Sequence, residues 1–175
     1  MAKGQAKTNA MRMLERAGIP YQPVYYEISD EEFSGSAVAR LLGLDAATCF
    51  KTLCARGEHK GVLVFVIPVD EELDLKAAAL AAGDKRVELI HARELQGLTG
   101  YIRGGVSPVG MKKRYPTFFD ATAAAFTEIE ISGGAKGCSL VVAPQVVADF
   151  LQASFAPLTR KKPSVDEGTT LRGSE

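Results

Sequence analysis

Apolar residues recur three and four positions apart in several segments of the chain, the spacing that predicts helices with one buried face. Gly18 and Pro20 end the first of these segments, and Gly43 ends the second. Asp45 is placed to cap one further short turn. The predicted helices span Gln5–Ala17, Ser36–Leu42, Asp74–Ala82, His91–Gly97 and Pro144–Ala153.

Short runs of aromatic and β-branched residues lie between these helices and predict strands. Phe50–Arg56 and Val62–Val69 are joined by the turn Gly57–Gly61, which indicates a β-hairpin. Because Val62–Val69 is apolar on both faces, we expect it at the centre of its sheet. Further strands are predicted at Tyr21–Ile28, Tyr101–Val106, Thr117–Asp120, Glu128–Ile131 and Ser139–Val142.

Helices interleaved with short strands and a hairpin indicate an α+β fold. We expect a mixed, largely antiparallel sheet rolled into a barrel-like core with helices around it. The length of 175 residues suits one domain with a real core, which we place at residues 1–160. Residues 161–175 are polar and show no periodicity beyond Pro163, so they are predicted to be a flexible tail.

The composition is that of an ordinary globular protein, with 46% hydrophobic residues, 24% charged residues and a net charge of zero. This balance argues against a sequence-blind polyanion or DNA binder, so contacts with nucleic acid should be local. No secretory signal opens the chain, no apolar run is long enough to cross a membrane, and three cysteines form no paired framework. A reducing cytoplasm fits best.

Several kinds of chemistry have no motif in this sequence. His59 and His91 are far apart and the cysteines lack metal-ligand spacing, so no metal site is expected. Phosphate-loop and dinucleotide motifs are missing, and no cofactor is predicted. Ser107 lies in a segment similar to a nucleophile elbow, but the next residue is Pro108, which has no N–H to donate to an oxyanion.

Three features are compatible with a small polar pocket. Lys51 shares one face of its predicted strand with Leu53 and Ala55, where it either reaches solvent at a sheet edge or enters a pocket. The segments 104–110 and 131–137 both combine paired glycines with a hydroxyl, and such loops can turn backbone N–H groups toward a developing negative charge. Each glycine loop taken alone is equally compatible with a tight structural turn.

These segments carry a resemblance to a known family. Phe50-Lys51-Thr52-Leu53, Gly-Gly-Val-Ser-Pro-Val-Gly at 104–110 and Ser132-Gly133-Gly134 resemble the signature segments of the YbaK/EbsC family. This family is similar to the editing domain of bacterial prolyl-tRNA synthetases, and its members hydrolyse the ester that joins a wrong amino acid to tRNA. The form of the loop 104–110 resembles the branch typified by cysteinyl-tRNA(Pro) deacylase.

The resemblance also implies site residues. It implies catalytic positions at Lys51, Gly105 and Ser107, and tRNA contacts at Lys112, Lys113 and Arg114. Where the family often has an aspartate, this chain has Ser139, so an acidic partner for the substrate's ammonium group or for Lys51 is missing or replaced. The substrate-binding positions implied are Tyr26, Phe33, Thr52, Gly104, Pro108, Ser132, Gly133, Gly134 and Ser139.

The expected activity is metal-free deacylation of mischarged tRNA, most simply Cys-tRNA(Pro). Prolyl-tRNA synthetase is the expected partner that delivers the tRNA, and the nucleophile is either water or the thiol of the substrate. Three alternatives remain open. They are a deacylase for another small amino acid such as alanine, a module that binds aminoacyl-tRNA or a synthetase without turnover, and a thiol redox protein that uses Cys49, Cys54 and Cys138.

Overall fold

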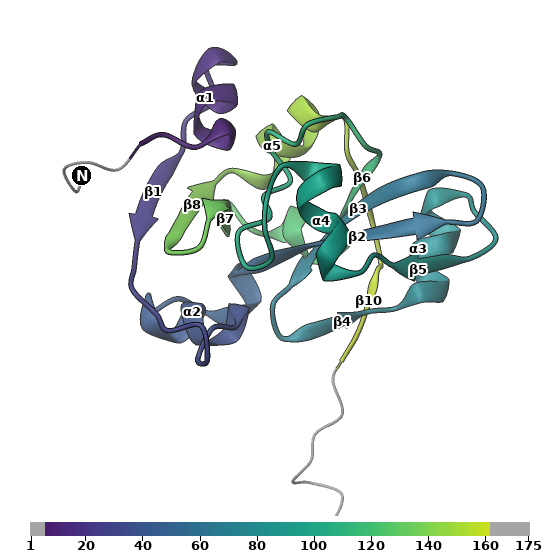
Figure 1. The fold of residues 1–175 in the computed structure, drawn as a ribbon, viewed down its shortest axis with the longest axis horizontal. Coiled ribbons are helices and arrows are strands. Elements are labelled where there is room, and N and C mark those ends of the chain that lie inside the picture. The colour runs from purple at the N-terminus through teal and green to yellow at the C-terminus, as the bar shows by residue number, and fades with distance from the viewer. Residues whose placement is uncertain (1–5, 162–175) are drawn as a thin grey trace, which may run out of the picture.

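The computed structural model of the chain describes residues 6–161, and Figure 1 shows helices arranged around twisted sheets. The largest sheet has the strand order β5-β2-β3-β6-β9. The expected central position of the apolar strand is confirmed, because β3 has two strands on each side. The strands are β2 (Phe50–Gly57), β3 (Gly61–Pro68), β5 (Val87–Leu89), β6 (Thr117–Asp120) and β9 (Ser154–Ala156).

Two smaller sheets complete the β-structure of the described residues. One has the order β1-β8-β7, with β1 at Gln22–Tyr25, β7 at Ile129–Ala135 and β8 at Cys138–Val142. The other pairs β10 (Thr159–Lys161) with β4 (Glu71–Leu73). All paired strands are antiparallel except β3–β6 and β6–β9, which confirms the mixed, largely antiparallel prediction.

The two larger sheets meet at the start of β2. A single parallel bridge joins Cys49, the residue before β2, to Glu130 in β7. This bridge brings the face of the β7–β8 hairpin beside Lys51 and Thr52, far from them in sequence. Within residues 6–161 the strands form these three open sheets, so a barrel-like closure stays a prediction.

Capping side chains mark the start of three of the five helices in residues 6–161. Thr8 accepts a hydrogen bond from Met11 N, so the first helix begins at Asn9 rather than in the residues before it. Asp74 caps the third helix and Asp45 caps a short 3-10 turn, both as expected. The helices are α1 (Asn9–Arg16), α2 (Gly35–Leu41), α3 (Leu75–Ala82), α4 (Ala92–Thr99) and α5 (Pro144–Leu151), with 3-10 turns at Ala46–Thr48 and Ala121–Ala125.

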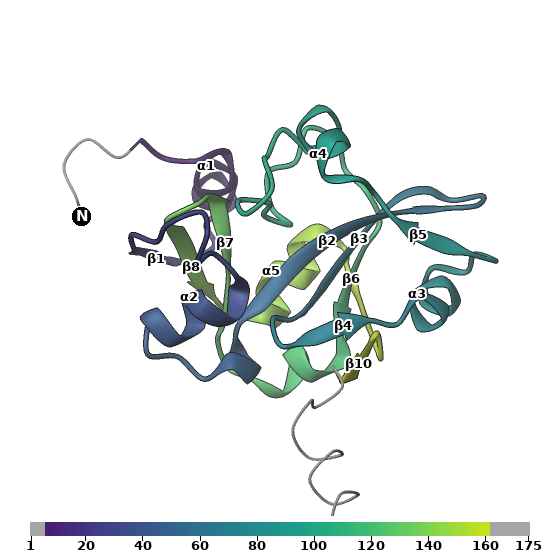
Figure 2. The same ribbon diagram turned by 60° about the horizontal axis from the view of Figure 1, so that its bottom comes forward.

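The core is divided by the large sheet. One cluster joins α1 and α5 to β7, β8 and the start of β2, around Phe50 and Phe119. A second packs α3 against one face of the β2–β3 hairpin through Leu63 and Phe65. A third covers the opposite face with α4 and the following loop, around Cys54. Figure 2 shows α3 and α4 on opposite sides of β2 and β3.

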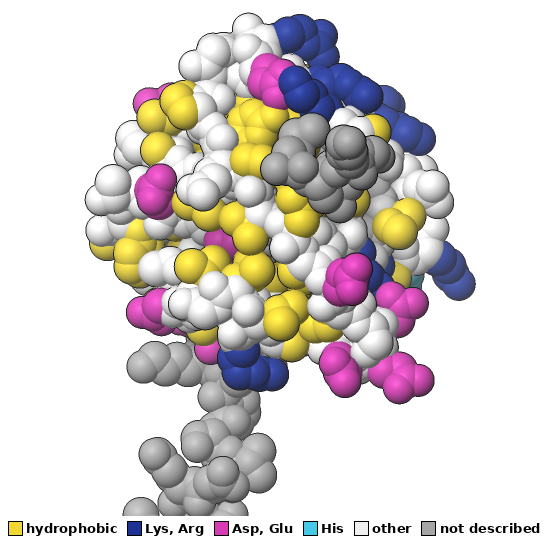
Figure 3. Space-filling model, turned by 90° about the vertical axis from the view of Figure 1, so that its left-hand side faces the viewer, with side chains coloured by type: hydrophobic (Ala, Val, Ile, Leu, Met, Phe, Trp, Pro, Cys, Tyr) yellow, Lys and Arg dark blue, Asp and Glu magenta, His cyan; other side chains and the backbone are white. Residues whose placement is uncertain are grey.

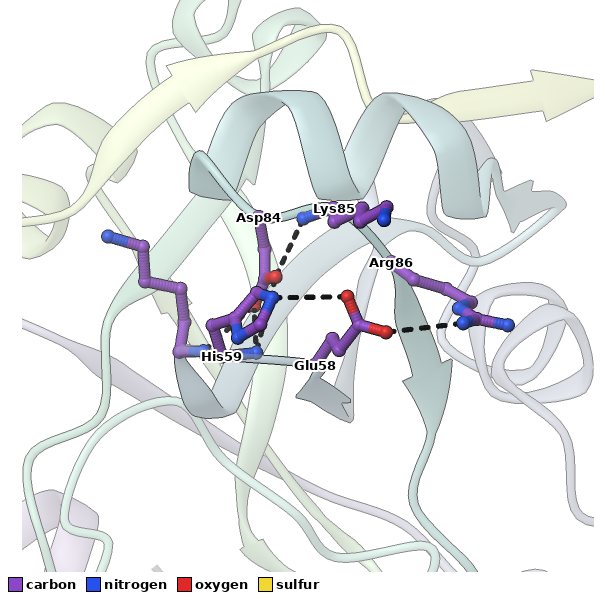
Figure 4. Close-up of polar contacts among 6 residues, drawn as sticks. Glu58, His59, Asp84, Lys85 and Arg86 are labelled. Carbon is purple, nitrogen blue, oxygen red and sulfur yellow. Dashed lines mark hydrogen bonds and ion pairs between the residues drawn. The ribbon is translucent and has the colours of Figure 1, made fainter.

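The tip of the β2–β3 hairpin is held by one carboxylate. Asp84, just after α3, accepts hydrogen bonds from the backbone N–H groups of His59, Lys60 and Lys85, at 3.0, 2.8 and 2.6 Å (Figure 4). Burial raises the pKa of this carboxyl, but the three backbone donors outweigh burial and lower it below its ordinary value. Asp84 therefore connects the hairpin to the helix that covers it.

One expected strand is wrong, four short strands were not predicted, and the expected tail lies almost entirely outside the described residues. Tyr101–Val106 is a loop rather than a strand, because the Tyr101 hydroxyl donates to Val109 O at 2.6 Å and Gly104 has a φ of +89°. The three-residue strands β4, β5, β9 and β10 were not predicted, since such short strands carry too little periodicity. Of the predicted tail, Lys161 ends β10 and residues 162–175 lie outside the described residues.

Candidate active site

A cavity of about 1040 Å³ opens beside the first half of β2. Its walls come from β2, from the β7–β8 hairpin, from the segment that leads into α2, and from α4 with the loop that follows it. Polar groups from these separate segments meet here, as in a typical ligand-binding site. Seven predicted substrate or catalytic residues line it, namely Tyr26, Phe33, Lys51, Thr52, Gly104, Ser132 and Ser139.

Lys51 lies on β2 opposite Ile67 and is half-buried in the cavity wall. Its Nζ donates a hydrogen bond to Val69 O at 3.2 Å, at the end of the neighbouring strand β3. Of the two placements that the sequence allowed, the structure has the one in which this lysine enters a pocket. An ammonium group held at a cavity wall is placed to bind an ester oxygen or a phosphate.

Thr52 follows Lys51 and also lines the cavity. Its Oγ1 is buried and has no hydrogen-bond partner among residues 6–161. A buried hydroxyl without a partner is uncommon, because the loss of its hydration is not compensated. A bound molecule that accepted a hydrogen bond from this hydroxyl after a small movement of the side chain would compensate for that loss.

Three polar side chains form a network on the wall opposite β2. The hydroxyl of Ser139, which is 1% exposed, hydrogen-bonds both the Tyr26 side chain and the Glu130 carboxyl. Glu130 is 6% exposed, lines the cavity, and also hydrogen-bonds the thiol of Cys49. Burial raises the pKa of Glu130, and the hydrogen bonds from Ser139 and Cys49 oppose this shift only in part.

Glu130 is a buried cavity residue that was not predicted from the sequence, and neither were Asp30 and Lys136 at the rim. It alternates with Ile129 and Ile131, a pattern that normally places a charged residue on the solvent face of a strand. In the structure both faces of β7 are covered, one by the core and the other by the cavity wall. One feature of the sequence could have revealed it, because Glu130 is a single charged residue between two isoleucines in the first half of the strand.

The rim of the cavity is closed by contacts between distant segments. Lys136, in the turn between β7 and β8, forms an ion pair with Asp30 and lies over the Phe33 ring. Gly104 lies next to both, because a Cβ atom there would be 3.0 Å from Lys136 Cε and 3.3 Å from the Phe33 ring. The loop before α2, the β7–β8 hairpin and the loop after α4 therefore meet at this point.

Other predicted site residues do not line the cavity. The Ser107 side chain is fully buried and its Oγ accepts a hydrogen bond from Val109 N at 3.2 Å, while Gly105 N donates to Ile102 O at 2.9 Å. The N–H that we expected to face the substrate at Gly105 is thus engaged in a turn. Gly133 and Gly134 also lie outside the cavity lining. So does Pro108, which lines the second cavity described below.

The glycines of these two loops serve close packing. A Cβ atom at Gly105 would be 3.0 Å from the Cα of Ala135, and one at Gly133 would be 2.6 Å from Cys138 Sγ. A Cβ atom at Gly134 would be 2.9 Å from the Tyr101 ring. The loop 104–110 therefore rests against the β7–β8 hairpin at distances that only glycine permits.

A basic segment lies beside a second, smaller cavity. Lys112, Lys113 and Arg114 are exposed, and the last two line this cavity of about 70 Å³ together with Pro108 and with Met13 of α1. Figure 3 shows lysine and arginine side chains gathered near the top of one face.

The cysteines do not have the properties of redox-active thiols. Cys49, Cys54 and Cys138 are free and buried. Burial raises the pKa of Cys49 to about 12 and that of Cys54 to about 11, and it also raises the pKa of Cys138. Thiols react as thiolates, so these values argue against the redox alternative. Within residues 6–161 no group of three or more His, Cys, Asp or Glu side chains could hold a metal ion.

No helix in the described part of the chain has the length and apolar character needed to cross a membrane.

The fold itself has close counterparts among solved structures. A crystal structure titled as a hypothetical protein, APE2540, superposes with a TM-score of 0.80 at 24% identity, covering 87% of this chain and all of that one. Another, described as a candidate trans-editing enzyme for prolyl-tRNA synthetase, gives a TM-score of 0.75 at 23% identity over 89% of this chain and 99% of that one.

Sequence comparison gives the family. The EbsC protein of Enterococcus faecalis, named as a candidate Cys-tRNA(Pro)/Cys-tRNA(Cys) deacylase, is 42% identical over 160 residues, which cover 91% of this chain and 98% of that protein. The sequence model of the aminoacyl-tRNA editing domain matches residues 31–150, a segment that contains Lys51, Thr52, Glu130 and Ser139. The chain therefore belongs to the aminoacyl-tRNA editing domain family, in its YbaK/EbsC group, and is a hydrolase that acts on aminoacyl-tRNA.

Proposed function

We propose that this protein is a free-standing deacylase that hydrolyses the ester of mischarged tRNA, with Cys-tRNA(Pro) as its substrate. The observation that supports this most directly is the cavity beside β2, where Lys51 and the unpartnered Thr52 hydroxyl lie next to each other in sequence and line one wall. The similarity to EbsC, whose name assigns the same substrate to that protein, gives independent support. Charged tRNA occurs in the cytoplasm, which is where we place the activity.

The cavity residues divide the work of ester hydrolysis as follows. Lys51 binds the ester oxygen or the phosphate of the terminal adenosine, and Thr52 donates its hydroxyl to the carbonyl oxygen that becomes negative. Gly104 is the residue of the loop 104–110 that lines the cavity, and we assign it the backbone contact that we first expected from Gly105. Ser132 and Ser139 shape the opposite wall, which holds the amino-acid side chain.

An aminoacyl ester is more reactive than an amide, so orientation and stabilisation of one oxyanion supply much of the rate acceleration that is required. The attacking group is water or, for a cysteine ester, the thiol of the substrate itself. Neither route needs a nucleophilic side chain from the protein. The cavity wall agrees with this, because within residues 6–161 the hydroxyl of Ser132 accepts a hydrogen bond from Gly134 N and that of Ser139 hydrogen-bonds Glu130, rather than a histidine.

We assign the docking of the tRNA to the basic segment Lys112–Arg114. The net charge of zero limits non-specific attraction, so a modest number of phosphate contacts must act together with the cavity. Prolyl-tRNA synthetase is the partner that we propose to deliver the tRNA, because an enzyme without a net positive charge gains effective concentration from association with the protein that releases the mischarged product.

A second substrate, alanine on tRNA(Pro), is supported by one specific observation. Ser139 hydrogen-bonds Glu130 and Tyr26 across the wall that would surround the amino-acid side chain, and this differs from the aspartate that the family often has there. A smaller side chain fits the same cavity with fewer contacts.

The deciding experiment incubates purified protein with Cys-tRNA(Pro), Ala-tRNA(Pro) and Pro-tRNA(Pro), without added metal, and measures loss of the ester. The Lys51→Ala variant serves as the comparison, with Lys85→Ala, an exposed lysine beside the hairpin tip, as the matched control. Rapid loss of the cysteine ester that depends on Lys51 supports the proposal. Loss of only the alanine ester reassigns the substrate, and no loss of any ester, even with prolyl-tRNA synthetase present, refutes catalysis in favour of a binding role.

A further inference from the structure

The carboxyl of Glu130 is placed where a cationic group of a ligand would lie. It forms part of the cavity wall and is only 6% exposed, so most of the side chain is covered by protein and a small part of it is open to the cavity. Its position is fixed by the backbone, because Glu130 lies at the parallel bridge to Cys49 where the two large sheets meet. One step along the chain, Phe50 and Lys51 begin the wall that carries the proposed ester contacts.

The groups that hold Glu130 are neutral hydrogen-bond donors. Ser139 and Cys49 hydrogen-bond its carboxyl and orient it, but a hydroxyl and a thiol do not neutralise a negative charge. A carboxylate in a largely buried place is stabilised when a cation pairs with it. Burial raises the pKa of Glu130, as expected for a carboxyl whose charged form lacks full compensation within the wall.

The substrate class supplies such a cation. An aminoacyl ester carries its α-ammonium group on the carbon next to the ester carbonyl, so a carbonyl held near Thr52 brings the ammonium group to within a few ångströms of the surrounding wall. The β7–β8 hairpin forms the wall that meets β2 at the bridge between Cys49 and Glu130. Glu130 is the carboxyl that this hairpin contributes to the cavity lining.

We propose that Glu130 binds the α-ammonium group of the aminoacyl moiety and that Ser139, which hydrogen-bonds both Glu130 and Tyr26, positions this carboxylate. This inference rests on the proposed function, since it assigns a specificity contact within the same cavity. The acidic group that the sequence analysis judged missing or replaced at position 139 is thus supplied from the neighbouring strand. Ser132 and Ser139 lie directly opposite each other in the β7–β8 pairing, two positions along from the pair Glu130 and Val141 and therefore on the same face of the hairpin.

The test uses two probes that cannot be hydrolysed. The first is the 3′-amide analogue of cysteinyl-adenosine, which keeps the α-ammonium group, and the second is its des-amino counterpart, in which hydrogen replaces that group. Binding of each is measured by calorimetry or by fluorescence anisotropy. Wild-type protein should bind the amine probe about 10- to 100-fold more tightly than the des-amino probe, the range of a hydrogen bond to a charged group.

Variants then assign that preference. Glu130→Gln keeps the shape and the hydrogen bonds but removes the charge, and it should bind the two probes equally. Glu128→Gln, two residues earlier and exposed, is the matched control and should keep the wild-type preference. Ser139→Ala should reduce the preference partially, because it releases the carboxylate without removing it.

Each outcome separates this inference from the proposed function. A wild-type protein that hydrolyses the ester but binds both amide probes equally, or binds neither, overturns the role of Glu130 and leaves the deacylase intact. An equal loss of affinity for both probes in Glu130→Gln also overturns it, because the carboxylate then maintains the shape of the cavity wall and does not recognise the ammonium group. A clear amine preference that depends on Glu130, in a protein that hydrolyses no ester, supports this contact and refutes catalysis.

Discussion

The ammonium group of Lys136 lies 5.0 Å from the centre of the Phe33 ring and at the same time forms an ion pair with Asp30. Lys136 comes from the β7–β8 turn, whereas Phe33 and Asp30 come from the loop before α2. Phe33 and Lys136 also line the cavity. This contact therefore fixes the distance between two walls of the cavity at its rim.

Replacement of Lys136 by methionine should weaken substrate binding more than it changes stability. The side chain keeps much of its apolar contact but loses the cation–π and ionic contacts, and the ionic contact is weak because the Asp30 carboxylate is exposed to solvent. We expect KM for the aminoacyl ester to rise about two- to fivefold with kcat little changed, and the difference from wild type to shrink in high salt. Lys85→Met is the control, and a fall in kcat alone would contradict this role.

Replacement of Thr52 by valine should separate stability from activity. The Thr52 Oγ1 is buried without a partner in the described structure, so valine of the same shape removes an uncompensated hydroxyl, and we expect an unchanged or higher Tm. The same change should lower kcat/KM about tenfold, because the hydroxyl is proposed to contact the carbonyl.

Thr117→Val is the matched control for that experiment. The Thr117 hydroxyl is also buried, but it donates to Tyr115 O at 3.0 Å, so its removal leaves an acceptor without its donor and should lower Tm. Equal effects of the two substitutions on Tm would show that the Thr52 hydroxyl has a partner in solution.

Charge removal at Lys113 and Arg114 should change the salt dependence of tRNA binding. Each phosphate contact that is lost reduces the slope of log K against log salt by roughly 0.7 to 0.9. The double alanine variant should bind tRNA more weakly at low salt with a flatter slope, measured by filter binding at several salt concentrations. Binding of the small amide probes should not change, and a wild-type slope in the variant would exclude this segment from the tRNA interface.

The stability contributed by Asp84 should depend on pH. Its folded-state pKa lies below the ordinary value of 3.8, so its hydrogen bonds to the hairpin tip are fully stabilising well above that pH and are lost as the pH falls through the folded-state pKa. Asp84→Asn, which keeps only one acceptor oxygen, should therefore lower Tm relative to wild type from about pH 7 to about pH 5, and the gap should narrow below 3.8. A gap that stays constant down to about pH 2.5 would contradict this assignment.

The sequence predicted the α+β class, the β2–β3 hairpin, the central strand and all five helices, because each of these carries a strong periodic or capping signal. The strands of three residues escaped prediction since one alternation is too short to recognise. Tyr101–Val106 was predicted as a strand on its aromatic and β-branched residues, but the buried Tyr101 hydroxyl and the positive φ of Gly104 hold it as a loop. Local propensity is overridden there by tertiary contacts.

The site was predicted in part. Lys51, Thr52, Tyr26 and Ser139 line one cavity, although they come from two strands and a connecting segment. The glycine loops were interpreted through their potential to donate N–H groups, whereas Gly105 and Gly133 instead permit close backbone contact, a property of the partner segment that no local sequence reveals. Glu130 was missed for a related reason: alternation indicates which residues share a face of a strand, but not what covers that face.

The close packing of the loop 104–110 on the β7–β8 hairpin has an evolutionary consequence. Gly105 and Gly133 are constrained by the backbone they touch, so the scaffold tolerates little change at those positions. The cavity-facing positions Glu130, Ser132 and Ser139 carry no such constraint on chain geometry, because they are side chains on paired strands of fixed register. Two substitutions, one on each strand, therefore suffice to move a carboxylate between positions 139 and 130, and the amino-acid preference of such a cavity can change while its backbone stays the same.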